Sequence, residues 1–290
     1  MSRVLVTGAA GVVGGYVADV FGGHDLVLTD IVGDVDRLDV TDPAAVRAVV
    51  SGARPEIVLH LAAATDVDRC EQEPDLAFRT NAIGTQNVAL AARDVGAILV
   101  YISTAGVFGG EKPTPYTEFD EPGPANVYGR SKLAGERIVQ TFLDRFYIAR
   151  AGWMVGGGPK DKKFVGKLLQ IMEGGETRLR AVDDKYGTPT FARDLATGIL
   201  GLLETDHFGL YHLVNGGGAC SRYDVAVALR DILGRDEVTV EPVDSAFFPL
   251  PAPRARSEAM VNYKLQLLGL DRQRHWREAL QAYVCDELLG

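Results

Sequence analysis

Short apolar runs alternate with helical patterns through the first half of this chain. Runs rich in β-branched residues predict strands near 3–7, 26–29, 57–60, 98–103 and 146–150. Apolar residues at helical spacing predict helices near 12–21, 43–52, 75–94 and 127–144. Because parallel strands need helical crossovers between them, this alternation predicts an α/β fold, a doubly wound parallel sheet covered on both faces. Ligands are expected at the carboxyl ends of its strands.

After residue 150 the alternation weakens, and glycine and proline interrupt the pattern more often. Loops of that kind are typical of a lobe that binds a variable ligand. We therefore expect one domain at 1–150 and a smaller substrate-binding lobe that makes up most of 151–290. The apolar run 211–215 is still typical of a buried strand, so we expect the chain to return to the main sheet there, with the two domains interleaved.

The first predicted strand leads into the glycine-rich turn Gly8-Ala9-Ala10-Gly11-Val12-Val13-Gly14 and then into a helix. Gly8 permits the tight turn, Gly11 lets the backbone approach a pyrophosphate, and Gly14 allows close helix packing. The N–H groups at the start of the helix, beside Val12 and Val13, are then aimed at phosphates. This arrangement predicts a Rossmann-like dinucleotide site. The alternative is a tight strand-to-helix turn without a ligand.

The second predicted strand ends at Asp30-Ile31, where a carboxylate can accept hydrogen bonds from an adenosine ribose. A 2′-phosphate would meet a like charge there, so Asp30 favours NADH over NADPH. Arg37 offers a cation to that phosphate and leaves both cofactors open. Asp39-Val40 suits the adenine, and the small residues Ala62-Ala63-Ala64 after the third strand let the backbone lie against the cofactor. We interpret His60 as a packed histidine.

Tyr128 and Lys132 are four residues apart on a predicted helix, and Thr104 ends the strand before it. Residues at this spacing share one face of a helix, so the Lys132 ammonium is expected to lower the pKa of the Tyr128 phenol. Acid–base work near neutral pH needs a shift of roughly 3 units from the usual tyrosine value. Tyr128, Lys132 and Thr104 are therefore the candidate catalytic residues.

Composition excludes several other classes of function. A net charge of −9 without a basic block argues against binding to nucleic acid or to an anionic membrane surface. The three cysteines, Cys70, Cys220 and Cys285, are far apart and predict neither a disulfide framework nor a metal site. The first residues lead directly into a strand and no apolar stretch reaches membrane-spanning length, so we expect a cytoplasmic protein.

The order of these motifs resembles that of the extended short-chain dehydrogenase/reductases, in particular the dTDP-4-dehydrorhamnose reductases. The resemblance covers nearly the whole chain. It includes the loop 62–71, Asn81-Ala82, Ile102-Ser103-Thr104, the segment 124–132, Arg150-Ala151-Gly152-Trp153, Lys163-Phe164-Val165, the segment 184–190, Ser221-Arg222-Tyr223 and the tail from Arg254.

The resemblance implies reduction of a keto group on a nucleotide-linked deoxysugar by NADH or NADPH, in a protein that is a possible homodimer. It implies that Tyr128 gives the proton, Thr104 binds the carbonyl oxygen and Lys132 also binds the nicotinamide ribose. Asn81 joins the cofactor-binding set, and Thr65, Val67 and Asp68 join the substrate-binding set. By the same resemblance, Trp153 packs beside the sugar and Arg254 meets a phosphate of the nucleotide.

One departure concerns the two positions after Thr104. The reductases usually carry an Asp-Tyr pair there, whereas this chain has Ala105-Gly106. The dehydratases of the same branch carry an acid pair that protonates a leaving hydroxyl, so Ala105-Gly106 argues against dehydration. Two further alternatives stay open: a 4-epimerase of the branch, and a non-catalytic subunit that resembles the regulatory subunit of methionine adenosyltransferase.

Overall fold

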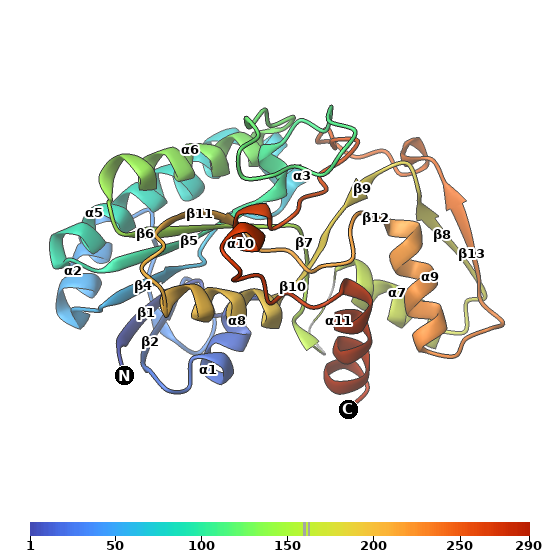
Figure 1. Ribbon diagram of the computed structural model, residues 1–290, viewed down its shortest axis with the longest axis horizontal. Coiled ribbons are helices and arrows are strands. Elements are labelled where there is room, and N and C mark those ends of the chain that lie inside the picture. The colour runs from blue at the N-terminus through green and yellow to red at the C-terminus, as the bar shows by residue number, and fades with distance from the viewer. Residues whose placement is uncertain (159–160, 162) are drawn as a thin grey trace.

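A seven-stranded parallel sheet forms the larger part of the computed structural model, which describes residues 1–158, 161 and 163–290 (Figure 1). The strand order is β11-β6-β5-β4-β1-β2-β3. The bounds of the strands are β1 Arg3–Thr7, β2 Asp25–Asp30, β3 Asp36–Arg37, β4 Ile57–His60, β5 Ile98–Thr104, β6 Phe146–Ala151 and β11 Gly209–His212. Three of the five predicted strands in the first half, β2, β5 and β6, are extended by one or two residues, and β1 and β4 match their predictions. The predicted doubly wound sheet is confirmed.

Helices cover both faces of this sheet (Figure 1). One face packs against α2 (Pro43–Ala53), α5 (Thr85–Val95) and α6 (Val127–Phe142), and the other against α1 (Val17–Val20) and α8 (Ala192–Leu203). Alternate residues of β1 point to opposite faces of the sheet. Leu5 packs against the helix layer that contains α2, α5 and α6, whereas Val4 and Val6 pack against the layer that contains α1 and α8. The sheet is therefore buried on both sides, which explains its continuous apolar runs.

Two predicted helices differ from the structure. The first, expected at 12–21, consists of a 3₁₀ turn at Gly14–Tyr16 followed by α1, because the adjacent glycines 14 and 15 disfavour a regular first turn. The second, expected at 75–94, is divided into α4 (Pro74–Phe78), a π-helical turn at Arg79–Gly84 and α5. Such wide turns are often found at functional sites, and this one holds the buried Asn81.

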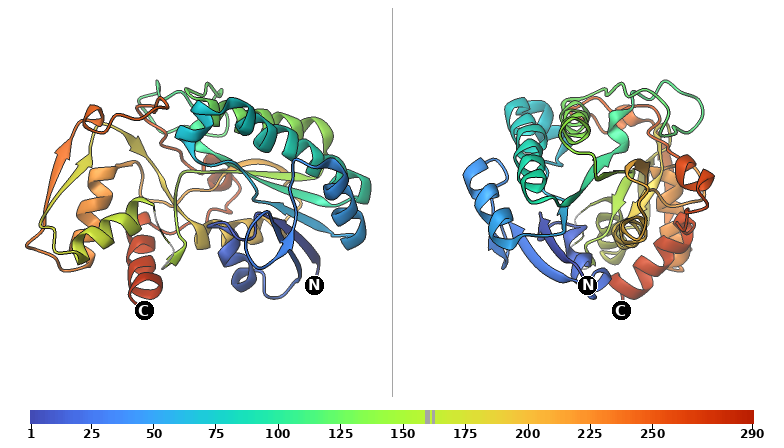
Figure 2. Two further views of the ribbon diagram at one scale, coloured as in Figure 1. Left: turned by 180° about the vertical axis from the view of Figure 1, so that it is seen from behind. Right: turned by 60° about the vertical axis from the view of Figure 1, so that its left-hand side comes forward.

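A smaller lobe follows the sheet, and the left-hand view of Figure 2 shows its helices and strands beside the sheet. Its core lies between α7 (Phe164–Glu173), α9 (Arg222–Ile232), α11 (Trp276–Ala282) and the parallel pair β8 (Arg178–Val182) and β13 (Thr239–Val243). Short pairs connect lobe and sheet: β7 (Trp153–Val155) with β10 (Pro189–Phe191), and β9 (Tyr186–Gly187) with β12 (Cys220–Ser221).

The remaining short elements are α3 (Val67–Gln72), α10 (Tyr263–Leu267), the 3₁₀ turns Ala105–Val107 and Ser245–Phe247, and a π-helical turn at Tyr283–Leu288. The strand expected at 211–215 is found two to three residues earlier, as β11 (Gly209–His212), and it pairs with β6 at the edge of the main sheet as expected. The division of the chain at residue 150 stays a prediction. Among the described residues, no helix combines the length and the apolar character that crossing a bilayer requires.

Candidate active site

A cavity of about 1320 Å³ lies where the carboxyl ends of the central strands face the lobe. Its walls include the turn after β1, the end of β2, the loop after β4, the start of α6, and β7. The neighbours of β1 are β2 on one side and β4 on the other, so the strand order reverses there. Open α/β sheets bind ligands at such a switch point.

The glycine-rich turn forms one end of the cavity. Gly8 has a φ of +77°, and a Cβ built on it would lie 2.5 Å from the backbone nitrogen of Ala62, so only glycine fits. Gly11, Val12, Val13 and Gly14 also line the cavity. The loops after β1 and β4 thus lie in contact, and they leave a backbone-lined cradle of the kind that a dinucleotide diphosphate fits.

The Asp30 carboxylate lies at the same end and organises the turn. It accepts hydrogen bonds from the backbone nitrogens of Ala10 at 2.9 Å, Ile31 at 2.7 Å and Val32 at 3.2 Å. Asp30 also lines the cavity. Arg37 donates to the carbonyl oxygen of Ile31 at 2.8 Å, so its guanidinium is already bonded at the rim.

Of the other predicted cofactor residues, five line the cavity and two, Ala64 and Asn81, do not. Ile31, Asp39, Val40, Ala62 and Ala63 line the cavity.

Ala64 and Asn81 lie behind the cavity wall. The Asn81 side chain accepts from the nitrogen of Ala64 at 2.8 Å and donates to its carbonyl oxygen at 3.0 Å. The same amide donates to the hydroxyl of Ser131 on α6 at 2.9 Å. Asn81 therefore fastens the loop after β4 to the helix that carries Tyr128.

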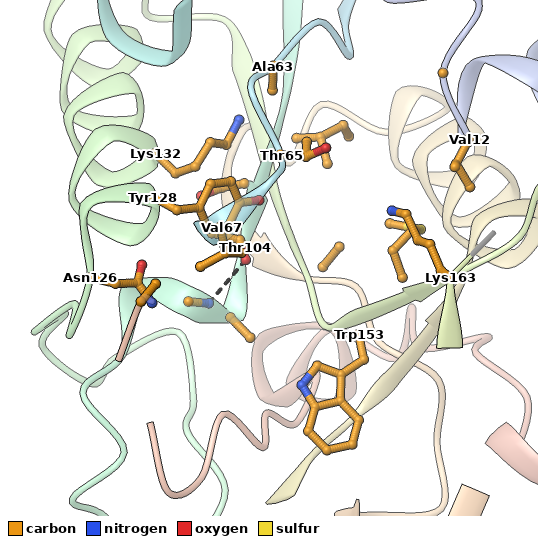
Figure 3. A pocket seen from close by; sticks show the side chains of 18 of the residues that line it. Val12, Ala63, Thr65, Val67, Thr104, Asn126, Tyr128, Lys132, Trp153 and Lys163 are labelled. Atoms are coloured by element: carbon orange, nitrogen blue, oxygen red, sulfur yellow. Dashed lines mark hydrogen bonds between the residues drawn. The ribbon is translucent and has the colours of Figure 1, made fainter. Parts of the chain in front are cut away.

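Helix α6 presents Tyr128 and Lys132 to the cavity (Figure 3). Its N-terminus is fixed by Asn126, whose side chain accepts a hydrogen bond from the nitrogen of Gly129 at 2.9 Å. A Cβ at Gly129 would overlap the carbonyl oxygen of Gly106, so this glycine lets the helix approach the turn after Thr104. The Thr104 hydroxyl accepts from the nitrogen of Gly106 at 3.1 Å. The three candidate catalytic side chains share one end of the cavity.

The expected lowering of the Tyr128 pKa is wrong for this structure. Burial raises the pKa of Tyr128 to about 12, and hydrogen bonding with Thr104 opposes that rise. Burial also lowers the pKa of Lys132 to about 7, against the negative charge of Glu136. The Lys132 ammonium lies 4.1 Å from the centre of the Tyr101 ring. Tyr128 is therefore a protonated donor at neutral pH, because desolvation outweighs the opposing effect of the hydrogen bond with Thr104.

A buried ion pair holds α6 in place behind these residues. The Arg150 guanidinium donates twice to Glu136, at 2.8 and 2.7 Å, and the Ser103 hydroxyl donates to the same carboxylate at 2.5 Å. Glu136 follows Lys132 by one helical turn, whereas Ser103 and Arg150 belong to β5 and β6. The network therefore joins the catalytic helix to two central strands. The sequence did not predict this network, because its three residues are far apart in the chain and meet only in the folded protein.

The predicted substrate residues are only partly brought together. Thr65, Val67 and Trp153 line the cavity, and the indole nitrogen of Trp153 donates to Glu258 at 3.2 Å. Asp68 does not line it.

Asp68 is instead paired with Arg254, whose guanidinium donates to the carboxylate at 2.9 Å and to the carbonyl oxygen of Ala252 at 2.8 Å. Arg254 lines the cavity, but both terminal nitrogens of its guanidinium already donate hydrogen bonds within the protein.

Sequence reasoning missed four charged residues that line the cavity from the lobe: Lys163, Lys185, Arg222 and Glu258. All four lie in segments that carry the resemblance, but no single segment indicated that these side chains meet at one cavity. Burial lowers the pKa of Arg222 to about 10, and burial raises the pKa of Glu258. The lobe thus contributes charge as well as shape to the cavity.

Comparison with known proteins agrees with this geometry. The family described as RmlD substrate binding domain matches residues 2–288. The dTDP-4-dehydrorhamnose reductase of Mycobacterium tuberculosis is 38% identical over 286 residues, which cover 96% of this chain and 91% of the relative.

Two solved structures are similar over nearly their whole length. A dTDP-4-dehydrorhamnose reductase from Clostridium acetobutylicum has a TM-score of 0.91 and 37% identity, covering 97% of this chain and 98% of that one. The reductase from Bacillus anthracis, solved in complex with NADP, has a TM-score of 0.90 and 36% identity, with coverage of 97% and 98%. This chain therefore belongs to the RmlD substrate binding domain family, that is, to the dTDP-4-dehydrorhamnose reductases among the extended short-chain dehydrogenase/reductases.

Proposed function

We propose that this protein is an oxidoreductase that uses NADH or NADPH to reduce the keto group of a nucleotide-linked deoxysugar, as in the conversion of dTDP-4-dehydrorhamnose to dTDP-rhamnose. The observation that carries the proposal is the continuity of one cavity. It joins the glycine-rich cradle at Gly8 to the side chains of Thr104, Tyr128 and Lys132. A dinucleotide in the cradle has its nicotinamide directed toward those three groups.

The charges along the cavity support an anionic substrate. Its lining contains six basic residues (Arg79, Lys132, Lys163, Lys185, Arg222 and Arg254) and three acidic ones (Asp30, Asp39 and Glu258). The whole chain has the opposite balance, with a net charge of −9. Two of the acids lie at the end that suits the ribose hydroxyls of the cofactor. The positive charge left at the lobe end suits the diphosphate of a nucleotide sugar.

The proposed chemistry needs few groups. Bound NADH or NADPH supplies a hydride to the keto carbon. Tyr128, protonated at neutral pH, gives its proton to the carbonyl oxygen, and Thr104 donates a hydrogen bond to that oxygen. Lys132 binds the nicotinamide ribose and, when charged, stabilises the phenolate that Tyr128 becomes. The phenolate then regains a proton from solvent, so one carbonyl, one hydride and one proton yield one alcohol, and the cofactor would be left oxidised.

The turn after Thr104 bears on the choice of sugar. Gly106 lines the cavity, and a Cβ built on it would lie 3.4 Å from the Thr104 hydroxyl oxygen and 3.7 Å from the Tyr128 ring, which is ordinary contact. The backbone there would accept a Cβ, so the open space beside Thr104 and Tyr128 is present because the sequence has glycine at position 106, not because the fold requires it. The space is available to a substituent of the sugar. Trp153 closes the opposite side (Figure 3).

A Tyr128→Phe variant tests the proposal. Loss of the proton donor should lower turnover of dTDP-4-dehydrorhamnose by about 100- to 10 000-fold. Affinity for NADPH, measured by fluorescence titration, should stay within about twofold, because the phenol is lost but the cradle is not. Turnover that remains at the level of the unmodified protein would remove Tyr128 from the mechanism.

A further inference from the structure

Two cationic side chains lie together at the lobe end of the cavity, beside Trp153. Lys163 immediately precedes α7, and Arg222 is the first residue of α9. The Arg222 guanidinium lies 4.0 Å from the centre of the Trp153 ring and 4.9 Å from that of Phe164. Both cations line the cavity, and Figure 3 shows Lys163 and Trp153 across from Tyr128. Two adjacent helix N-termini thus bring two positive charges to one place.

No acidic side chain among the described residues forms an ion pair with either cation. The nearest acids have other partners. Asp161 accepts from the backbone nitrogens of Lys163 and Gly166, at 2.7 and 3.1 Å, and from the hydroxyl of Tyr283 at 3.0 Å.

Glu258 accepts from the indole nitrogen of Trp153, and burial raises its pKa. Its capacity to neutralise Arg222 is therefore reduced. Partial desolvation lowers the pKa of Lys163; the negative charge of Asp161 opposes that change, and the positive charge of Arg222 adds to it. The positive charges of Lys163 and Arg222 repel each other, and an anion bound between them would reduce this repulsion.

Arg254 also lines the cavity but, unlike Lys163 and Arg222, it forms an ion pair. Its guanidinium is paired with Asp68, and its carbonyl oxygen accepts from Lys185 at 3.2 Å. Arg222 has a guanidinium held in place by two aromatic rings and without a hydrogen bond to a described residue. A guanidinium of that kind binds phosphate through two parallel hydrogen bonds at little cost in side-chain entropy.

We propose that Lys163 and Arg222 form the subsite for the diphosphate of the nucleotide-sugar substrate, a role that rests on the proposed function. The sugar then extends from this subsite past Trp153 to Tyr128. The same chemistry would also suit the diphosphate of the cofactor. Figure 3 shows Lys163 between Trp153 and Val12 of the glycine-rich turn, whereas the Arg222 guanidinium lies over the Trp153 ring, so the position of Arg222 favours the substrate.

Calorimetric titration of dTDP and, separately, of NADPH into the full chain distinguishes these two sources. Arg222→Gln and Lys163→Gln should each weaken dTDP binding by about 10- to 100-fold, the effect of losing a charge-assisted hydrogen bond. NADPH affinity should not change. In turnover, KM for the nucleotide sugar should rise while kcat at saturation stays within about threefold.

Matched controls come from the same two helices. Arg230→Gln on α9 and Lys167→Gln on α7 remove the same charges outside the cavity and should bind dTDP normally. Arg222→Lys should recover part of the affinity, since it keeps the charge but not the paired geometry. Circular dichroism establishes that each variant is folded. If Arg222→Gln does not fold, the solvent-accessible Lys163 still provides the test.

Normal dTDP binding by folded Lys163→Gln and Arg222→Gln would overturn the subsite, and so would a loss confined to NADPH. In either case the unmodified protein would still bind dTDP and reduce its substrate. Failure of the proposed function has a different result, because the unmodified protein would then neither bind dTDP nor oxidise NADPH in the presence of the keto sugar.

Discussion

Replacement of Lys132 by methionine should abolish activity and yet stabilise the fold. Lys132 is 3% exposed, and burial lowers its pKa from the usual 10.5 to about 7. In the unfolded chain the ammonium is hydrated and keeps its usual pKa. Between about pH 7 and 10.5 the unfolded state therefore binds more protons than the folded state, so the stability of the unmodified protein should rise with pH across that window.

The pKa difference gives the magnitude. Each unit corresponds to about 1.4 kcal/mol, so the buried lysine costs about 4 kcal/mol at pH 7. Methionine fills a similar volume but loses the contact with the Tyr101 ring, which is worth about 1 to 2 kcal/mol. The net gain is about 2 to 3 kcal/mol. For a chain of this length that is roughly 3 to 5 °C in melting temperature.

Calorimetric melting at pH 7 and at pH 10.5 measures the effect. The gain of Lys132→Met over the unmodified protein should be present at pH 7 and nearly vanish at pH 10.5, where the lysine is neutral in the folded state and half protonated in the unfolded state. Lys167→Met, on the exposed side of α7, should show no such pattern. A Lys132→Met variant that is less stable at pH 7, or whose gain does not depend on pH, would refute the reasoning.

Other substitutions test the cofactor site and the packing beside it. Asp30→Ala should weaken NADH binding by about tenfold and NADPH binding less, because the ribose acceptor and the like charge are lost together; an unchanged ratio of dissociation constants would contradict the assignment. Gly129→Ala should cost about 2 kcal/mol or more in chemical denaturation, since its Cβ would overlap the Gly106 carbonyl. Gly201→Ala, in α8 with open space around it, should be neutral or stabilising by up to about 1 kcal/mol; equal losses in both variants would refute the packing argument.

Local sequence rules were sufficient for the sheet and for the cradle. The strands of the first half are short apolar runs whose neighbours in the chain are helices, and the turn at Gly8 has a backbone conformation that glycine alone adopts readily. Tyr128 and Lys132 are one helical turn apart, so their approach to a common cavity also followed from local spacing. These features depend on residues that are close together in the chain.

The pKa of Tyr128 and the pairing of Arg254 depend on tertiary packing and could not be predicted in that way. Burial decides the first, and the exposure of a side chain is set by elements distant in sequence. Asp68 and Arg254 are separated by 186 positions and meet only because the tail of the chain returns to α3. Lys163 and Arg222 likewise converge only in the folded lobe. Sequence spacing carries no information about such contacts.

The most direct test of the proposed function is to follow oxidation of NADPH and formation of product together. The purified protein is mixed with NADPH and dTDP-4-dehydrorhamnose, the loss of absorbance by the reduced nicotinamide is recorded, and the nucleotide sugars are separated by chromatography. We expect one dTDP-rhamnose for each NADPH consumed. Intact dTDP-4-dehydrorhamnose beside unoxidised NADPH, in a protein that still binds both, would contradict the proposed reduction.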